Sequence, residues 1–341
     1  MKQAKVKNLI IGGGAPITIQ SMTNLSVLDV DATLQQIDQL QTAGCDIVRI
    51  ALPNSQSVEA FAKVRAKTNV PLVADVHFDY RLAIGGMESG ADKIRINPGN
   101  IDKQHLDRVI DCAKMHNVAI RLGVNGGSAN KTYLEKFNGD KKLALLESLR
   151  DYTSYFADRG FDNLVLSVKS SDIRQTIELN KSIATLGYPL HLGITEAGLL
   201  HQGLVKNAIG IGSLLLDGIG DTIRVSLTSN PVDEVYAAKD ILVSLGLKSG
   251  VQFVSCPKCG RCSIDLEKIA TQIYDYVKTL NKNIKVAVMG CEVNGPGECK
   301  DADIGIAGAN GGYILFKHGQ IYKRIDANNV LQQFIEEINK L

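Results

Sequence analysis

The segment "PLVADVHFDYRLAIGGMESGADKIRIN", residues 71–97, contains one complete structural repeat of this chain. It opens with a short run of β-forming residues, passes through a polar turn into a helical stretch, and closes on a second β-forming run. Strands that alternate with helices in this way favour parallel pairing, because the helix returns the chain to the start of the next strand. This repeat predicts an α/β fold.

The same rhythm continues through the first 245 residues. Helical stretches are expected between the strands, for example over 31–44 and 141–160. A series of eight βα units without a ninth predicts a (β/α)₈ TIM barrel of about 250 residues, with a doubly wound sheet as the alternative. The eight strands are expected at 17–22, 46–52, 71–76, 92–97, 118–124, 163–168, 189–194 and 221–227.

The composition changes after "ILVSLGLKSG", residues 241–250. Cysteines become frequent, the βα rhythm stops, and glycine- and proline-containing loops take over. We therefore expect a barrel domain over 1–245 and a smaller α+β domain over 246–341. In the second domain, strands are expected near 283–291, 302–308, 312–319 and 320–325, followed by a helix near 328–340.

Charge and composition narrow the function classes. The net charge of +2 is too weak to indicate a nucleic-acid partner. The sequence shows no apolar run of about 18 residues, so no membrane span is expected. The N-terminal residues 1–16 lack the apolar core of a secretory signal. Seven cysteines, an odd number that includes a CxxC pair, fit metal ligation in a reducing cytoplasm better than a disulfide framework.

Basic residues interrupt strands that should be apolar. Unpaired buried charges cost several kcal/mol, so these cations need anionic partners. Ion pairs with Asp75, Asp92, Glu196 and Asp221 are one explanation; an anionic ligand at the barrel mouth is the other, which we favour because arginine forks suit phosphate oxygens. The cations are Arg49, Arg95, Arg121 and Arg224, with Lys169 at the end of the sixth strand.

Other polar residues near strand ends have less certain roles. His77 and His191 are as consistent with structure as with ligand contact. Asp75 and Glu196 are candidates for acid/base work or for binding a substrate hydroxyl. Cys45 and Cys112 fall in apolar contexts and are expected in the core.

Five cysteines in the last third of the chain predict a metal site. "VSCPKCGRCS", residues 254–263, contains Cys256, Cys259 and Cys262, and "GCEVNGPGEC", residues 290–299, contains Cys291 and Cys299. A CxxC pair with distant partners serves both zinc and iron–sulfur clusters. From composition alone, zinc bound by Cys256, Cys259, Cys291 and either Cys262 or Cys299 is the simplest arrangement.

Several long motifs make a family resemblance specific. They include "ADVHFDYR", "RINPGNI", "RLGVNGGS", "HLGITEAG", "AIGIGSLLLDGIGDTIRVSL", "CPKCGR" and "VAVMGCEVNGPGE". With them, the chain from "APITIQSMTN" to its C-terminus resembles the 4-hydroxy-3-methylbut-2-en-1-yl diphosphate synthase family, in its compact two-domain bacterial form.

The resemblance implies a TIM barrel that binds a cyclic diphosphate, followed by an α+β iron–sulfur domain. Its [4Fe–4S] cluster would be held by Cys256, Cys259, Cys291 and Glu298, which leaves Cys262 and Cys299 as spectators. A carboxylate is a harder and more weakly held ligand than thiolate, so its iron can exchange it for a substrate oxygen.

The implied reaction is reductive ring opening and dehydration of 2-C-methyl-D-erythritol 2,4-cyclodiphosphate to 4-hydroxy-3-methylbut-2-en-1-yl diphosphate, in the non-mevalonate isoprenoid pathway. Electrons would come from reduced flavodoxin or ferredoxin, and the enzyme would act as a head-to-tail homodimer. By the resemblance, Glu196 and Glu298 are the expected catalytic residues. The expected substrate-binding residues are Arg49, Arg95, Arg121, Asn125, Lys169, His191 and Ser226.

The same residues are consistent with two alternative functions. One is a non-redox TIM-barrel synthase of a phosphorylated substrate, of the pterin-binding kind, with a structural zinc domain. It accounts for the arginines but gives "NGPGE" no role. The other is an electron-transfer module on a barrel scaffold, which leaves the polar strand ends unexplained.

Overall fold

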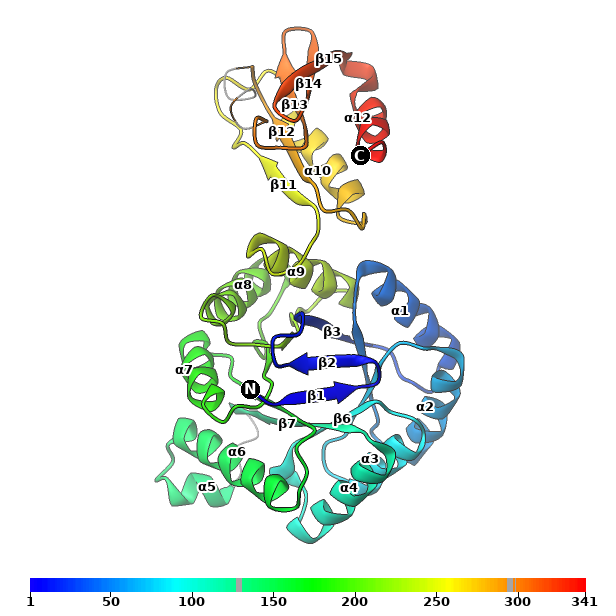
Figure 1. The fold of residues 1–341 in the computed structure, drawn as a ribbon, viewed down its shortest axis with the longest axis vertical. Helices are drawn as coiled ribbons and strands as arrows, with labels where there is room; N and C mark the ends of the chain where they lie inside the picture. The colour runs from blue at the N-terminus through cyan, green and yellow to red at the C-terminus, as the bar shows by residue number, and fades with distance from the viewer. Residues whose placement is uncertain (127–130, 293–296, 298) are drawn as a thin grey trace. The chain divides into compact units, whose positions relative to one another are not determined.

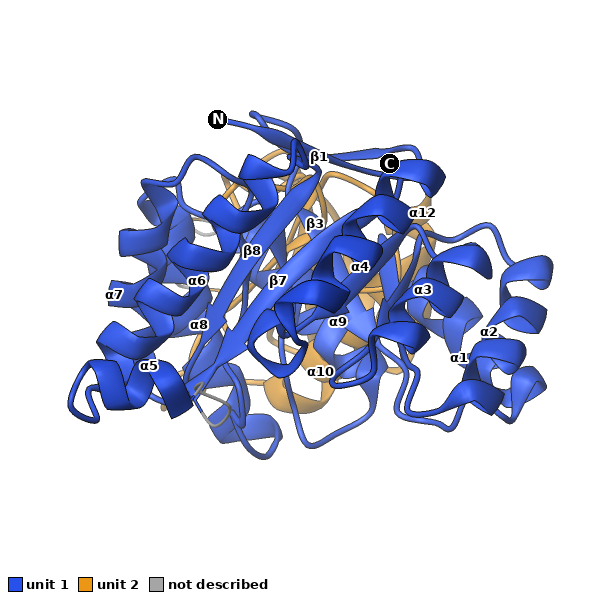
Figure 2. Ribbon diagram, turned by 90° about the horizontal axis from the view of Figure 1, so that it is seen from below, with its two compact units in different colours: residues 1–245 blue, residues 246–341 orange. Residues whose placement is uncertain are grey.

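The computed structural model describes residues 1–126, 131–292, 297 and 299–341. They form two compact units, residues 1–245 and 246–341, shown in separate colours in Figure 2. No helix in these ranges is long and apolar enough to cross a membrane.

The first unit is a parallel eight-stranded barrel, which confirms the predicted fold class. Neighbouring strands pair in the order β8-β7-β6-β5-β4-β3-β10-β9. A bridge between Leu166 and Leu190 joins β8 to the segment that enters β9 and so closes the ring. The strands are β3 (Thr18–Met22), β4 (Ile47–Ala51), β5 (Leu72–Asp75), β6 (Lys93–Ile96), β7 (Ala119–Asn125), β8 (Leu164–Lys169), β9 (His191–Leu192) and β10 (Thr222–Ile223).

The last two barrel strands are shorter than predicted. Regular pairing covers only two residues in each, where the sequence indicated six and seven. Beyond β10, Arg224 still donates its N–H to the Leu192 carbonyl, whereas Leu227 donates to the Glu234 carboxylate at 3.0 Å.

Helices surround the barrel strands on the outside (Figure 1). Most begin directly after an Asp or Asn whose side chain accepts a backbone N–H of the first turn, as Asn54 does from Ser57. The helices are α1 (Val30–Ala43), α2 (Ser55–Lys67), α3 (Tyr80–Glu88), α4 (Lys103–His116), α5 (Lys131–Lys136), α6 (Lys141–Asp158), α7 (Ile173–Ala184), α8 (Leu200–Leu216) and α9 (Pro231–Ser244), with a 3₁₀ turn η1 (Pro98–Asn100) after β6.

An N-terminal hairpin that the sequence analysis missed closes one end of the barrel. It consists of β1 (Gln3–Val6) and β2 (Leu9–Gly12), which pair antiparallel and lie across the barrel in Figure 1. The hairpin packs on residues at the starts of the barrel strands, and together they form an apolar floor. The floor comprises Ala4, Val6, Ile11, Ile47, Val73, Ala119 and Val165.

The second unit is built on a five-stranded mixed sheet. β11 (Gln252–Ser255), β12 (Lys285–Met289) and β13 (Ile304–Ala309) run parallel, and β14 (Gly312–Lys317) and β15 (Gln320–Asp326) continue antiparallel. Residues of α10 (Leu266–Val277) and α12 (Val330–Asn339) share its core, with a 3₁₀ turn η3 (Ala327–Asn329) before α12. The predicted strands and final helix are present, whereas β11 and α10 were not anticipated.

Candidate active site

A polar cavity lies where the barrel strands end. It has about 510 Å³ of empty space, part of it open to solvent. Among the described residues, four arginines, one lysine and one carboxylate reach it. The lining residues are Arg49, Asp75, His77, Arg95, Arg121, Gly123, Asn125, Ser167, Lys169, Ile194, Thr195, Arg224 and Ser226.

Strand register explains why these side chains converge. Alternate residues of a strand point to the same face, and paired residues of adjacent parallel strands lie side by side. Arg95 of β6 pairs with Arg121 of β7, and Asn125 of β7 pairs with Lys169 of β8. Five of the seven substrate-binding residues expected from sequence lie on four strands, β4 and β6–β8, around one cavity.

Asp75 is the carboxylate of the cavity and is almost fully buried. Its oxygens lie 3.7 Å from Arg49 Nε and 3.3 Å from Arg95 Nη1, and His77 lies beside it. Burial by itself would raise the pKa of Asp75, but Arg49, the hydrogen bond with His77, and Arg95 outweigh it and hold the pKa well below its ordinary range. Asp75 is therefore an ionised counter-charge, which argues against a role as a proton donor.

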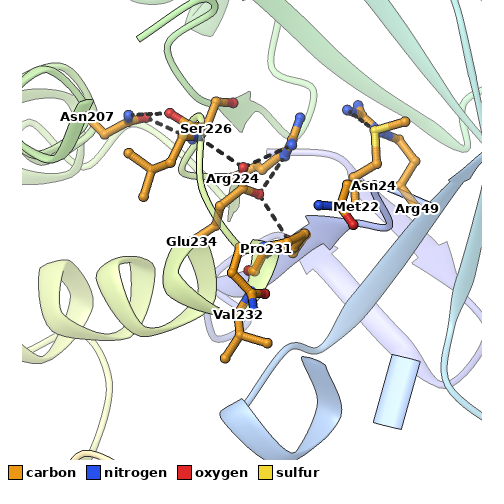
Figure 3. Close-up of polar contacts among 12 residues, drawn as sticks. Met22, Asn24, Arg49, Asn207, Arg224, Ser226, Pro231, Val232 and Glu234 are labelled. Carbon is orange, nitrogen blue, oxygen red and sulfur yellow. Dashed lines mark hydrogen bonds and ion pairs between the residues drawn. The ribbon is translucent and has the colours of Figure 1, made fainter. Parts of the chain in front are cut away.

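Arg224 has a partner that the sequence analysis missed. Glu234, at the start of α9 and buried, accepts hydrogen bonds from Arg224 Nε at 3.2 Å and Nη2 at 3.1 Å (Figure 3). It also accepts from Ser21 Oγ at 3.0 Å. In the sequence, Glu234 is recognisable only as an acidic residue in the first turn of a helix. A carboxylate at that position normally interacts favourably with the helix dipole, which does not point to an arginine partner.

Three of the four carboxylates considered as arginine partners have other positions. Asp92 pairs with Arg65 at 2.9 Å, Asp221 accepts the backbone N–H of Leu190 at 2.8 Å, and Glu196 is exposed. For these three carboxylates the ion-pair explanation is wrong. Of the four, only Asp75 lies within ion-pair distance of the strand arginines.

Arg121 and Lys169 have no carboxylate partner in the described part of the chain. Nε and Nη1 of Arg121 are buried without a hydrogen bond there. Burial, reinforced by the neighbouring arginines, holds the pKa of both Arg121 and Lys169 well below the ordinary value. Two buried basic groups without a carboxylate partner among the described residues indicate a site for an anionic ligand.

The remaining substrate-binding and catalytic residues expected from sequence lie at different depths relative to the cavity. Ser226 lines the cavity, and its loop is fixed by Asn207 of α8, whose Nδ2 donates to the Ser226 carbonyl at 3.1 Å (Figure 3). His191 is fully buried and does not line the cavity. Glu196 is exposed just beyond the lining residue Thr195, with a left-handed φ of +53°. A non-glycine residue in this conformation is strained, and such strain clusters at functional sites.

Three of the expected cluster ligands lie on neighbouring loops of the second unit. Cys256 directly follows β11 and Cys291 follows β12, and these strands pair in parallel with Ser255 opposite Val288. The Gly290 N–H donates to Cys256 Sγ at 3.2 Å, which joins the two loops. Cys259 is exposed, and Glu298 lies outside the described residues. The described residues hold no preassembled group of three ligands, but thiols on two joined loops fit a thiolate-bound cluster.

The other four cysteines are buried or half-buried among packed side chains. Cys299 is fully buried in a small apolar cluster, and a Cβ on Gly305 would lie 2.7 Å from its sulfur. Cys262 fits under Gly290 in the same way, also at 2.7 Å, and donates to the Ile264 carbonyl. Cys45 and Cys112 are buried, as expected, and burial raises the pKa of Cys45 to about 12.

Comparison with known proteins covers both units. A family model described as the GcpE TIM-barrel domain matches residues 1–239, and one described as the GcpE protein C-terminal domain matches residues 252–340. The chain is 49% identical over 344 residues to 4-hydroxy-3-methylbut-2-en-1-yl diphosphate synthase (flavodoxin) of Natranaerobius thermophilus, covering 98% of this chain and 97% of that one. It is 48% identical over 339 residues to the Fusobacterium nucleatum protein of the same name, covering 98% and 96%.

Solved structures agree on the barrel. Yersinia pestis dihydropteroate synthase with a sulfonamide drug superposes with a TM-score of 0.50 at 13% identity, over 72% of this chain and all of that one. The same enzyme with a pterine–sulfa conjugate gives 0.50 at 11% identity. At this level of identity, the likeness shows the barrel fold alone.

Proposed function

The chain belongs to the GcpE family, and from that premise we propose that its barrel cavity binds 2-C-methyl-D-erythritol 2,4-cyclodiphosphate for reductive conversion to 4-hydroxy-3-methylbut-2-en-1-yl diphosphate. The family's activity favours this over the non-redox synthase with a zinc domain. The observation that carries the proposal is the excess of cations in the cavity, where Arg121 and Lys169 have no carboxylate partner in the described part of the chain.

The cationic side chains bind and orient the diphosphate. Arg49, Arg95 and Arg121 offer planar forks for phosphate oxygens, Lys169 a point charge, and Ser226 a hydroxyl. Opening the ring frees a diphosphate arm that carries more negative charge than the ring did. Fixed cations around that arm stabilise the developing charge without having to reorganise.

The second unit supplies the electrons in this proposal. Cys256, Cys259, Cys291 and Glu298 would hold a [4Fe–4S] cluster, which when bound supplies single electrons and an iron able to take up an oxygen ligand. Reduction of the substrate consumes two electrons and two protons and releases one water. Reduced flavodoxin is the donor we propose, in accordance with the names of the relatives, in a reducing cytoplasm where thiolates stay free for iron.

Proton delivery and ligand seating are assigned to three further residues. Asn125 lines the cavity beside Lys169 and would bind a ligand oxygen. Glu196 would deliver a proton from its strained loop position, because Asp75 is held ionised. His191 would act from below the cavity lining and not by direct contact.

Arg121→Met should separate binding from stability. We expect the Kd for the cyclic diphosphate to rise by about tenfold to a hundredfold, as for the loss of charge-assisted hydrogen bonds. Thermal stability should stay the same or increase, because the variant removes a buried charge that has cationic neighbours and no partner in the described residues. Calorimetry of binding and thermal unfolding measure the two effects.

Arg224→Met is the matched control for that variant. This variant removes the cation that pairs with the buried Glu234, so both the affinity for the cyclic diphosphate and the Tm should fall. The ligand assignment for Arg121 is wrong if Arg121→Met binds normally, or if it unfolds as readily as Arg224→Met.

The homodimer is a separate part of the proposal, supported by an apolar surface on α8. Leu200, Leu204, Val205, Ile209 and Leu216 are all exposed on this helix. Leu204 also lines a hollow with Ala237, Ile241 and Leu245 of the α9 region. Exposed apolar residues in such number on one helix often mark an interface, and we assign this helix surface to a second copy of the chain.

Ile209→Glu is expected to weaken that dimer. A charge placed in the apolar contact should raise the dimer Kd on the order of 30-fold, measured by sedimentation over a range of protein concentrations. Met115→Glu is the control, since Met115 is an exposed apolar residue on a different helix, α4. Equal dimer Kd values for Ile209→Glu and the wild type would rule out this face as the interface.

A further inference from the structure

Four buried polar residues lie on the inner side of the barrel, nearer the strand starts than the cavity residues. In the strand register, Lys93 pairs with Val73 and Ala119 of the apolar floor. Gln20, Lys93, His191 and Thr222, here called the inner layer, belong to β3, β6, β9 and β10. Each lies two positions before a residue of the cavity region on its own strand, and so points to the same side but nearer the strand start. The corresponding upper residues are Met22, Arg95, Gly193 and Arg224. Arg95 and Arg224 line the cavity, and Met22 contacts Arg49. A Cβ added to Gly193 would lie 2.6 Å from Lys169 Nζ.

The inner layer is fully buried and lacks hydrogen-bond partners. The exposed fraction is 1% for Gln20 and 0% for Lys93, His191 and Thr222. Every side-chain nitrogen and oxygen of the four is without a partner among the described residues 1–126, 131–292, 297 and 299–341. Buried polar groups are nearly always hydrogen-bonded, and a cluster of exceptions calls for a functional explanation.

Charged groups around the layer are mostly cations. Asp75 is engaged by Arg49 and Arg95, Glu234 by Arg224, and Asp221 by a backbone N–H. Burial, then Arg121 and Arg49, hold the pKa of Lys93 well below its ordinary value. Burial, then Arg121, Lys169, Lys93 and Arg49, do the same for the pKa of His191. Within the protein alone, the surroundings of both side chains therefore disfavour their protonated forms.

We propose that Lys93 is a positioning residue for this reaction: together with His191 it takes up a proton from solvent when a doubly anionic cyclic diphosphate enters the cavity. The ligand's negative charge replaces the repulsion between cations with attraction, so the protonated amine becomes favourable. The added positive charge then holds the ligand from beneath, without touching it. This inference rests on the proposed function, because it requires an anion in the cavity.

Proton uptake can be measured directly by calorimetry. The full chain, purified without air and titrated without reductant, receives 2-C-methyl-D-erythritol 2,4-cyclodiphosphate in two buffers of equal pH and different ionisation enthalpy. Ring phosphates lack the second ionisation near pH 6 that a phosphate monoester has, so buffer-dependent heat reports protons bound by the protein. We expect an uptake of up to about one proton, and a Kd that rises with pH by up to about tenfold per unit.

Two variants and a control identify the residues that take up the proton. Lys93→Met should lower the uptake by half or more and weaken binding at low pH, while its Kd approaches the wild-type value at high pH. His191→Gln should lower the uptake in part, and it gives an independent test if Lys93→Met folds poorly. Lys63→Met, an exposed position on α2, should match the wild type.

The possible outcomes separate the test of proton uptake from the test of the proposed function. Binding whose heat is the same in both buffers overturns proton uptake but leaves the cavity as the substrate site. Full uptake in both Lys93→Met and His191→Gln assigns the proton elsewhere and overturns the role of the layer. No binding in any buffer contradicts the proposed function, and the inference with it.

Discussion

Asp75→Asn is expected to lower the free energy of unfolding of the barrel unit by about 3–5 kcal/mol, since it leaves Arg49 and Arg95 without their buried counter-charge. For a unit of this size that corresponds to a fall in Tm of roughly 10 °C. The cyclic diphosphate should restore more stability to this variant than to the wild type, because it brings negative charge back into the cavity. Thermal unfolding with and without ligand measures both effects.

The pH dependence of this effect has a defined sign. The pKa of Asp75 is depressed in the folded protein, so its contribution is complete above the ordinary carboxyl pKa of 3.8 and is lost as pH falls through the lower folded value. The gap between wild type and variant should be full at neutral pH and should narrow only below about pH 4.

Asp31→Asn is the matched control for Asp75→Asn. Asp31 is exposed and lies 3.5 Å from Lys67, and such surface pairs contribute little to stability. If the two variants had equal stability at neutral pH, Asp75 would not be the counter-charge of the cavity.

Cys291→Ser is expected to remove most of the iron and all turnover. Cys291 is nearly buried, and its loop is joined to that of Cys256 through the Gly290 N–H. Loss of one thiolate from a cluster leaves an iron exposed to solvent and favours its release. Iron content, visible absorption and turnover with a chemical reductant, all on protein purified without air, are the measurements.

Cys262→Ser and Cys299→Ala serve as controls for the cluster ligands. Both should retain iron, because these sulfurs are packed beneath glycines and Cys299 lies in an apolar cluster. Cys299→Ala should cost about 1–2 kcal/mol of stability through the small cavity it creates. Iron loss in Cys262→Ser with retention in Cys291→Ser would reverse the assignment of ligands.

The barrel was predictable because its strands and helices repeat. Eight β-forming runs that alternate with helical stretches left little choice of architecture, and the cations among them marked the cavity. The hairpin β1–β2 was not predictable in the same way: its strands have four residues each, and their apolar side chains are identified as core only once the barrel floor exists to receive them.

Depth within the barrel was the main limit on predicting the site. Sequence shows that Lys93 and Arg95, or His191 and Gly193, point to the same side of a strand, but not which of them reaches the cavity. Glu234 illustrates the same limit for contacts between elements, because its pairing with Arg224 depends on how α9 packs against the end of β10. The sequence placed Glu196 beyond a predicted strand end, whereas its left-handed backbone conformation became visible only in the structure.

In the proposed function, this barrel works with an iron–sulfur cluster. Metal and acid-labile sulfide analysis of the full chain, purified without air, tests this directly. We expect about four iron and four sulfide per chain, as for a [4Fe–4S] cluster. A single zinc with no sulfide, in protein never exposed to oxygen, would contradict it and would leave the cationic cavity to serve a non-redox reaction.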